Sequence, residues 1–156
     1  MLITPHALLG AALVKRIDSF FWGIPLAITS HFALDAIPSW DVGLTSVKNI
    51  AIIITDGIIA FLLLSLLSVS RRGARREKIL LWTGGFFGIF PDVLSQGSNI
   101  LGIQGWNLFE NFHQSIQKTV PLSWSLPVQV LLTVILVGWI YYMTKYTSSI
   151  GVIKTK

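Results

Sequence analysis

The chain has 156 residues, of which 53% are hydrophobic and only 12% are charged. Ordinary globular proteins carry about twice that share of charged residues, so the composition excludes a typical soluble domain. Cysteine is absent, which excludes a disulfide frame, a thiolate metal site and a cysteine nucleophile. The net charge of +5 is not gathered on a basic face interleaved with polar residues, and we expect no nucleic-acid partner.

Apolar runs predict an all-α, polytopic membrane bundle of about five helices, with membrane lipid as its surrounding partner. The runs cover residues 4–16, 20–36, 49–69, 78–91 and 125–142. Thr4 is the expected N-cap of the first helix, and Pro5 suits its first helical position. A short amphipathic stretch over residues 106–117 precedes the last helix, on the outer side. We expect residues 1–146 to form a single membrane-embedded domain and residues 147–156 to form a short polar tail, with the oligomeric state open.

Basic residues predict the orientation of these helices, because cytoplasmic loops are enriched in lysine and arginine. No basic residue precedes the first helix, whereas Lys15 and Arg16 follow it, so we expect an N-terminus outside and a C-terminus in the cytoplasm. This arrangement leaves only Lys48 and Lys118 outside. The ten inner basic residues of the twelve are Lys15, Arg16, Arg71, Arg72, Arg75, Arg76, Lys78, Lys145, Lys154 and Lys156.

All three histidines and two nearby aspartates fall at the outer ends of the predicted helices. His31 and Asp35 are four residues apart, so they share one helix face. Imidazole and carboxylate groups suit zinc and similar divalent ions, and a cation offsets the cost of a carboxylate near hydrocarbon. We therefore predict a site for zinc or another divalent metal ion. Its expected ligands are His6, His31, Asp35, Asp92 and His113.

Each of these residues also has a purely structural interpretation. The histidines can lie at solvated helix ends or loops, the His31–Asp35 pair can be a hydrogen-bonded contact between helices, and Asp92 can end a helix. Asp56 lies two turns inside the third helix. It either orients a ligand histidine, accepts a proton during catalysis, or carries protons in a transporter.

Four short segments carry a family resemblance. They are Thr4-Pro5-His6, Ser30-His31-Phe32-Ala33-Leu34-Asp35, Gly88-Ile89-Phe90-Pro91-Asp92 and Phe112-His113-Gln114-Ser115. Together they resemble the YdjM-type membrane-bound metal-dependent hydrolases, which are distantly similar to zinc-dependent phospholipase C. Residues 30–41 also resemble the Ser-His-Phe-x-x-Asp-x-Ile-Pro-x-Trp-Asp signature of small bacterial membrane proteins. The chain departs from the family in the order of its elements, and Gln117 stands where a second histidine is expected after His113.

The resemblance implies a hydrolase of the bacterial plasma membrane that depends on a divalent metal ion. We expect it to act on a lipid-borne phosphoester at the outer interface, where Asp56 or Asp35 accepts the proton of the attacking water. Two alternatives stay open: a small transporter or ion-handling protein, and a non-catalytic protein with a structural metal. The inner halves of the helices carry almost no ionisable groups, which argues against a pathway through the full membrane depth.

Overall fold

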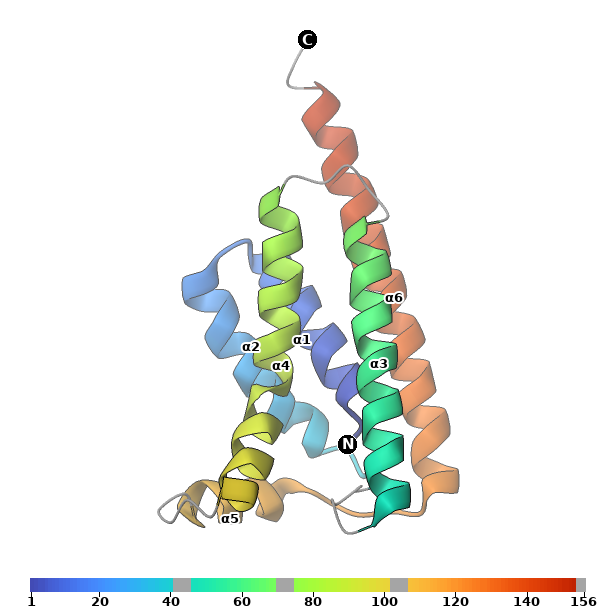
Figure 1. The fold of residues 1–156 in the computed structure, drawn as a ribbon. Helices are drawn as coiled ribbons and strands as arrows, with labels where there is room; N and C mark the ends of the chain where they lie inside the picture. Colours follow the sequence, from blue (N-terminus) through green and yellow to red (C-terminus); the bar gives the residue numbers. More distant parts are fainter. Residues whose placement is uncertain (41–45, 70–74, 102–106, 154–156) are drawn as a thin grey trace.

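The computed structural model describes residues 1–40, 46–69, 75–101 and 107–153, except for the side chains of 98–101, 107 and 146–153. These ranges form six helices and confirm the all-α prediction. The helices are α1 (Ile3–Ile17), α2 (Phe20–Asp35), α3 (Val47–Val69), α4 (Arg75–Leu101), α5 (Asn107–Ile116) and α6 (Leu122–Ile153). Figure 1 shows the short α5 lying across one end of the bundle that the longer helices form.

The start of α1 differs from the prediction. The helix begins at Ile3, so Thr4 lies inside the first turn and is not the N-cap. Donors at this end are satisfied by other helices instead: the backbone N–H of Leu2 donates to Gln129 Oε1 of α6 at 2.8 Å, and that of Thr4 donates to Asp56 Oδ2 of α3 at 3.0 Å. A sequence pattern predicts a helix cap only from residues close to the helix end. Here the hydrogen-bond partners of the first turn come from distant parts of the chain.

Two helices run further than their apolar stretches indicate. α4 was expected to end near Pro91 but continues through this proline to Leu101, despite the missing proline N–H. α6 continues to Ile153, into the segment expected to be a polar tail. The expected amphipathic segment is present as α5, and Trp106 at its predicted start lies outside the described residues.

α1 lies in the middle of the bundle and crosses α4 at very short range (Figure 1). A Cβ placed on Gly10 would collide with the carbonyl oxygen of Gly84 and lie 2.8 Å from Gly88 Cα. A Cβ on Gly88 would in turn collide with the carbonyl oxygen of His6. The two helices therefore meet through glycines, which places the first turn of α1 against the middle of α4.

Two of the described helices are long and apolar enough to cross a bilayer: α3, and α6 over Leu122–Lys145. α1 and α2 have 15 and 16 residues. At about 1.5 Å per residue they fall short of a hydrocarbon layer about 30 Å thick. The finding supports membrane association through two helices, and a bundle in which five helices are embedded stays a prediction.

Apolar side chains face outward on the two candidate spans. Exposed fractions are 58% for Phe61 and 66% for Leu66 in α3, and 61% for Leu131 and 63% for Val134 in α6. The buried positions near α1, by contrast, include three histidines, two aspartates and Gln129. Exposed apolar surface of this extent is rare in water-soluble proteins.

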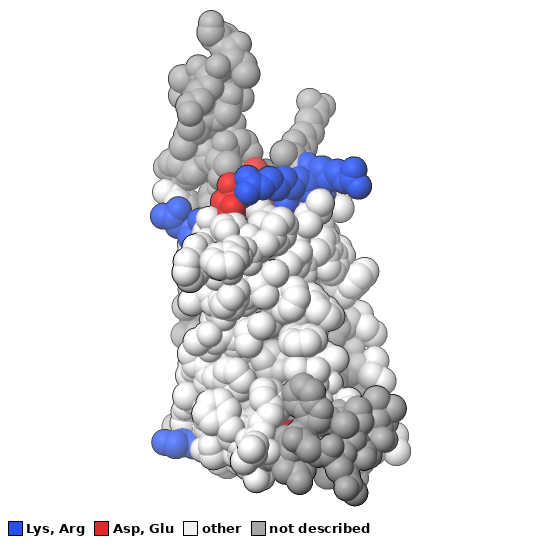
Figure 2. All heavy atoms as spheres, turned by 90° about the vertical axis from the view of Figure 1, so that its left-hand side faces the viewer, with Lys and Arg blue, Asp and Glu red and all other residues white. Residues whose placement is uncertain are grey.

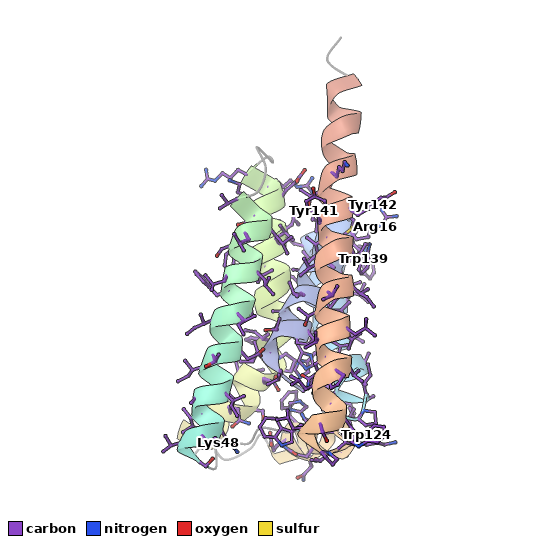
Figure 3. The ribbon with its side chains drawn as sticks, turned by 90° about the vertical axis from the view of Figure 1, so that its right-hand side faces the viewer. Arg16, Lys48, Trp124, Trp139, Tyr141 and Tyr142 are labelled. Carbon is purple, nitrogen blue, oxygen red and sulfur yellow. The ribbon has the colours of Figure 1, made fainter. Side chains whose placement is uncertain are left out.

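Charged side chains gather at the two ends of the bundle. Figure 2 shows lysine, arginine and acidic side chains at one end and a wide uncharged band below them. The exposed basic residues of that end are Arg16, Arg75, Arg76, Lys78 and Lys145. Figure 3 places Arg16 with Trp139, Tyr141 and Tyr142 at this end, and Lys48 with Trp124 at the other. Four of the predicted inner basic residues, namely Arg71, Arg72, Lys154 and Lys156, lie outside the described part.

Candidate metal centre

Four side chains from three helices converge on one small volume. They are His31 and Asp35 of α2, Asp92 of α4 and His113 of α5, and one donor atom of each lies within 4.8 Å of the others. His31 Nε2 and His113 Nε2 are 3.2 Å apart. Asp92 Oδ1 lies 3.5 Å from the first of these nitrogens and 3.6 Å from the second.

Asp35 lies at the centre of this group. Its Oδ2 is 3.1 Å from His31 Nε2 and 2.8 Å from His113 Nε2. Zinc bonds of about 2.0–2.1 Å in a tetrahedron separate neighbouring donors by about 3.3 Å, so the measured spacings match those of ligands that share one ion. The side chains of His31 and Asp35 have no exposed surface, whereas the side chain of Asp92 is 28% exposed. Water therefore reaches the cluster on the Asp92 side.

The backbone of α4 fixes the tautomer of His31. His31 Nδ1 lies 2.9 Å from the carbonyl oxygen of Gly88, which can only accept a hydrogen bond. Nδ1 therefore carries the proton, and in the neutral ring the Nε2 lone pair points at Asp35 and His113. This pattern, in which the far ring nitrogen is held by a carbonyl, is the usual support of a metal-binding histidine. The hydrogen bond from His31 to the Gly88 carbonyl depends on the position of α4. That position is set in part at Gly88, which packs against the first turn of α1.

α5 brings His113 over the cluster and is held there by polar contacts. Ser95 of α4 donates to Glu110 of α5 through a short hydrogen bond. Gln117, just past the end of α5, donates to Asp35 Oδ2 at 3.2 Å. Gln117, which stands in place of the expected second histidine, therefore contacts the cluster through its side-chain amide and not through a ring nitrogen.

His6 lies beside the four-donor group rather than within it. Its ring stacks on the His31 ring with centroids 4.1 Å apart, and its Nε2 is 3.2 Å from Asp35 Oδ1. The geometry of that contact is not that of a hydrogen bond, and both ring nitrogens of His6 are buried without a hydrogen-bond partner among the described residues. Burial of such nitrogens is costly unless a ligand, a water or a proton satisfies them.

Asp56 does not join the cluster. Its Oδ1 accepts a hydrogen bond from Thr4 Oγ1 at 2.7 Å and its Oδ2 accepts the Thr4 backbone N–H. The carboxylate is buried, and it lies at the N-terminus of α1, where the helix dipole favours negative charge. Asp56 therefore anchors the turn that carries His6, and both of its oxygens are engaged.

The charges of the cluster favour a further cation. Two carboxylates and two imidazoles meet there, and the N-terminal ammonium of Met1 lies 3.3 Å from Asp35 Oδ1, where it offsets one of the two negative charges. The described part of the chain places no lysine or arginine beside Asp92, whose contacts are the two histidines. A divalent ion would neutralise the remaining negative charge and accept both imidazole lone pairs. The group can thus hold a metal ion.

The sequence did not reveal two contributors to this arrangement. The Gly88 carbonyl has no side-chain signal, and Gln117 was noted only as a missing histidine. The spacing of four residues between His113 and Gln117 does place them on one helical face, so this spacing was the available signal for Gln117.

Comparison with known proteins adds no assignment: no protein-family profile, no curated protein and no solved structure matches this chain. The resemblance to YdjM-type hydrolases therefore stays a prediction from the motifs quoted above.

Proposed function

We propose that the protein is a membrane-bound hydrolase that depends on a divalent metal ion and cleaves a lipid-borne phosphoester at the extracytoplasmic surface. One observation carries this proposal: the donor atoms of His31, Asp35, Asp92 and His113 have the mutual spacing of ligands around one ion. The outward apolar faces of α3 and α6 support the membrane location, and the basic end of the bundle supports its orientation.

The chain's own residues would divide the work as follows. His31, His113, Asp35 and Asp92 would hold the ion, which would supply Lewis acidity toward a water molecule and the phosphoryl oxygen. Asp35 Oδ1 would accept the proton of the attacking water. This oxygen also accepts a hydrogen bond from the Met1 ammonium at 3.3 Å, and His6 Nε2 lies 3.2 Å from it. A phosphorus–oxygen bond to water forms, the ester bond breaks, and the proton passes to the leaving oxygen. Both carboxylate oxygens of Asp56, the other expected proton acceptor, already accept hydrogen bonds from Thr4.

A structural metal site is the second candidate, and one observation favours it. Structural zinc sites take all four ligands from the protein, whereas catalytic sites keep a position open for water. The cluster offers four donors, three of them from side chains no more than 2% exposed. The exposure of Asp92 and its longer distances to both histidines favour the catalytic assignment, because Asp92 is the ligand that can give way to water.

The deciding experiment measures metal content and phosphoester turnover on the same detergent-purified protein. We expect about one zinc-class ion per chain, and we expect His31→Ala and Asp35→Asn to lose both the ion and the turnover. Asp18→Asn is the matched control, because that carboxylate is exposed at the opposite end of the bundle and pairs with Arg76. Metal without turnover in the unmodified chain would favour the structural role, and absence of stoichiometric metal would refute both candidates.

A further inference from the structure

α5 presents three different faces beside the metal cluster. His113 is buried and points inward. Leu108 and Phe112 lie one turn apart on a second face and are 85% and 53% exposed. Gln114, six residues after Leu108, is exposed on a third, polar face. A helix that only covered a site in water would not need a strip of large exposed apolar side chains, so this second face requires a partner.

The position of α5 indicates what that partner is. Figure 1 shows α5 across the end of the bundle where α3 and α6 begin. Those two helices are the candidate spans, so this end lies where a bilayer surface would meet them. Figure 3 shows Lys48 and Trp124 at the same end, and Trp124 is 76% exposed. Exposed tryptophan and lysine are typical of the headgroup region.

The charges at this end complement an anionic surface. Lys48 and Lys118 are exposed, and Lys118 follows α5 directly. The one acidic residue of α5, Glu110, is engaged by Ser95 and Gln114. The end of the bundle therefore offers positive charge beside an apolar strip, which is the pattern of a helix lying in the interface plane.

We propose that α5 is an interfacial helix whose Leu108 and Phe112 insert at the headgroup–acyl boundary of an anionic bilayer, and that this insertion holds His113 over the metal cluster. The inference rests on the proposed membrane-bound function and adds lipid control of the site to it. Phe112 connects the two regions: its ring is 5.4 Å from Phe32, whose own ring is 5.8 Å from His113 and 5.4 Å from His31. Seating Phe112 in lipid thus fixes the aromatic rings packed around two ligands.

Spin labels test the placement of α5, because the chain contains no cysteine that would compete for the label. Leu108→Cys and, as the matched control, Gln114→Cys are labelled and reconstituted in vesicles of phosphatidylglycerol and phosphatidylcholine. We expect oxygen to relax the label at 108 more than a water-soluble nickel chelate does, and the reverse at 114. Greater relaxation by the chelate at both positions would overturn the proposal. Dipolar broadening at 108 that disappears on dilution with unlabelled chain would also overturn it, by showing that a second copy covers this face.

Turnover tests the link to the cluster. In Leu108→Ser, which keeps the Phe112 ring beside Phe32, we expect hydrolysis of vesicle phospholipid to fall at least about tenfold, with metal content and turnover of a short-chain soluble phosphoester unchanged. Gln114→Ala, on the polar face, should leave all three unchanged. Equal vesicle turnover in Leu108→Ser and the parent would overturn the proposal. If the parent hydrolyses neither substrate, the hydrolase proposal fails, and the spin-label result alone decides whether α5 lies in the interface.

Discussion

Gly88→Ala tests whether the crossing of α1 and α4 builds the metal site. The added Cβ would collide with the His6 carbonyl oxygen and lie 3.2 Å from Gly10 Cα. Both obstacles are backbone, so the helices must separate by roughly 1 Å to restore normal contact distances. Overpacking of this kind destabilises by about 1–3 kcal/mol.

The same shift would damage the cluster. The Gly88 carbonyl oxygen now lies 2.9 Å from His31 Nδ1, and a further 1 Å or so would break that hydrogen bond. Loss of such a support typically lowers metal affinity by about 10–100-fold. Gly97→Ala on the same helix is the control, since nothing lies within 4 Å of a Cβ at that position. There alanine should stabilise the helix by about 0.5–1 kcal/mol.

The assay pairs denaturant unfolding in detergent micelles with titration of zinc into metal-free protein. We expect Gly88→Ala to lower the free energy of unfolding and Gly97→Ala to raise it. Only Gly88→Ala should weaken zinc binding. A Gly88→Ala protein as stable as the parent, with unchanged zinc affinity, would refute the reasoning that the glycine contact positions His31.

Three further predictions concern single residues. Thr4→Val should lower the free energy of unfolding by about 1.5–3 kcal/mol, because buried Asp56 loses its hydroxyl donor, and Thr4→Ser should restore it in the same unfolding assay. Gln117→Ala should weaken zinc binding by about tenfold, measured by competition with a chelator, because Asp35 loses a donor; unchanged affinity would contradict this. In intact cells an impermeant thiol reagent should label Gln114→Cys and spare Lys78→Cys, both exposed positions, and the reverse result would invert the proposed orientation.

Periodicity and polar placement were sufficient to predict much of this molecule. The apolar runs predicted the helices, and the shared face of His31 and Asp35 predicted which side of α2 turns inward. Both residues are buried there beside Asp92 and His113. These features depend on local spacing or on composition, which a sequence carries directly.

Contacts between distant segments were not predictable in the same way. Asp56 caps α1 from another helix, a role that depends on how α3 packs and not on any spacing within α3. His6 was expected as a ligand equal to the others, but α1 places its ring against His31 instead of inside the four-donor group. Pro91 was expected to end a helix, but α4 continues through it to Leu101.

X-ray absorption at the zinc edge of the purified, zinc-loaded protein tests the central claim most directly. The account predicts one ion per chain, bound by two imidazole nitrogens and carboxylate oxygens at about 2.0–2.2 Å, with no sulfur. His113→Ala should remove one imidazole from the spectrum, while His6→Ala should leave the imidazole count at two. A spectrum without imidazole ligands, or one that His113→Ala leaves unchanged, would contradict the proposed metal centre.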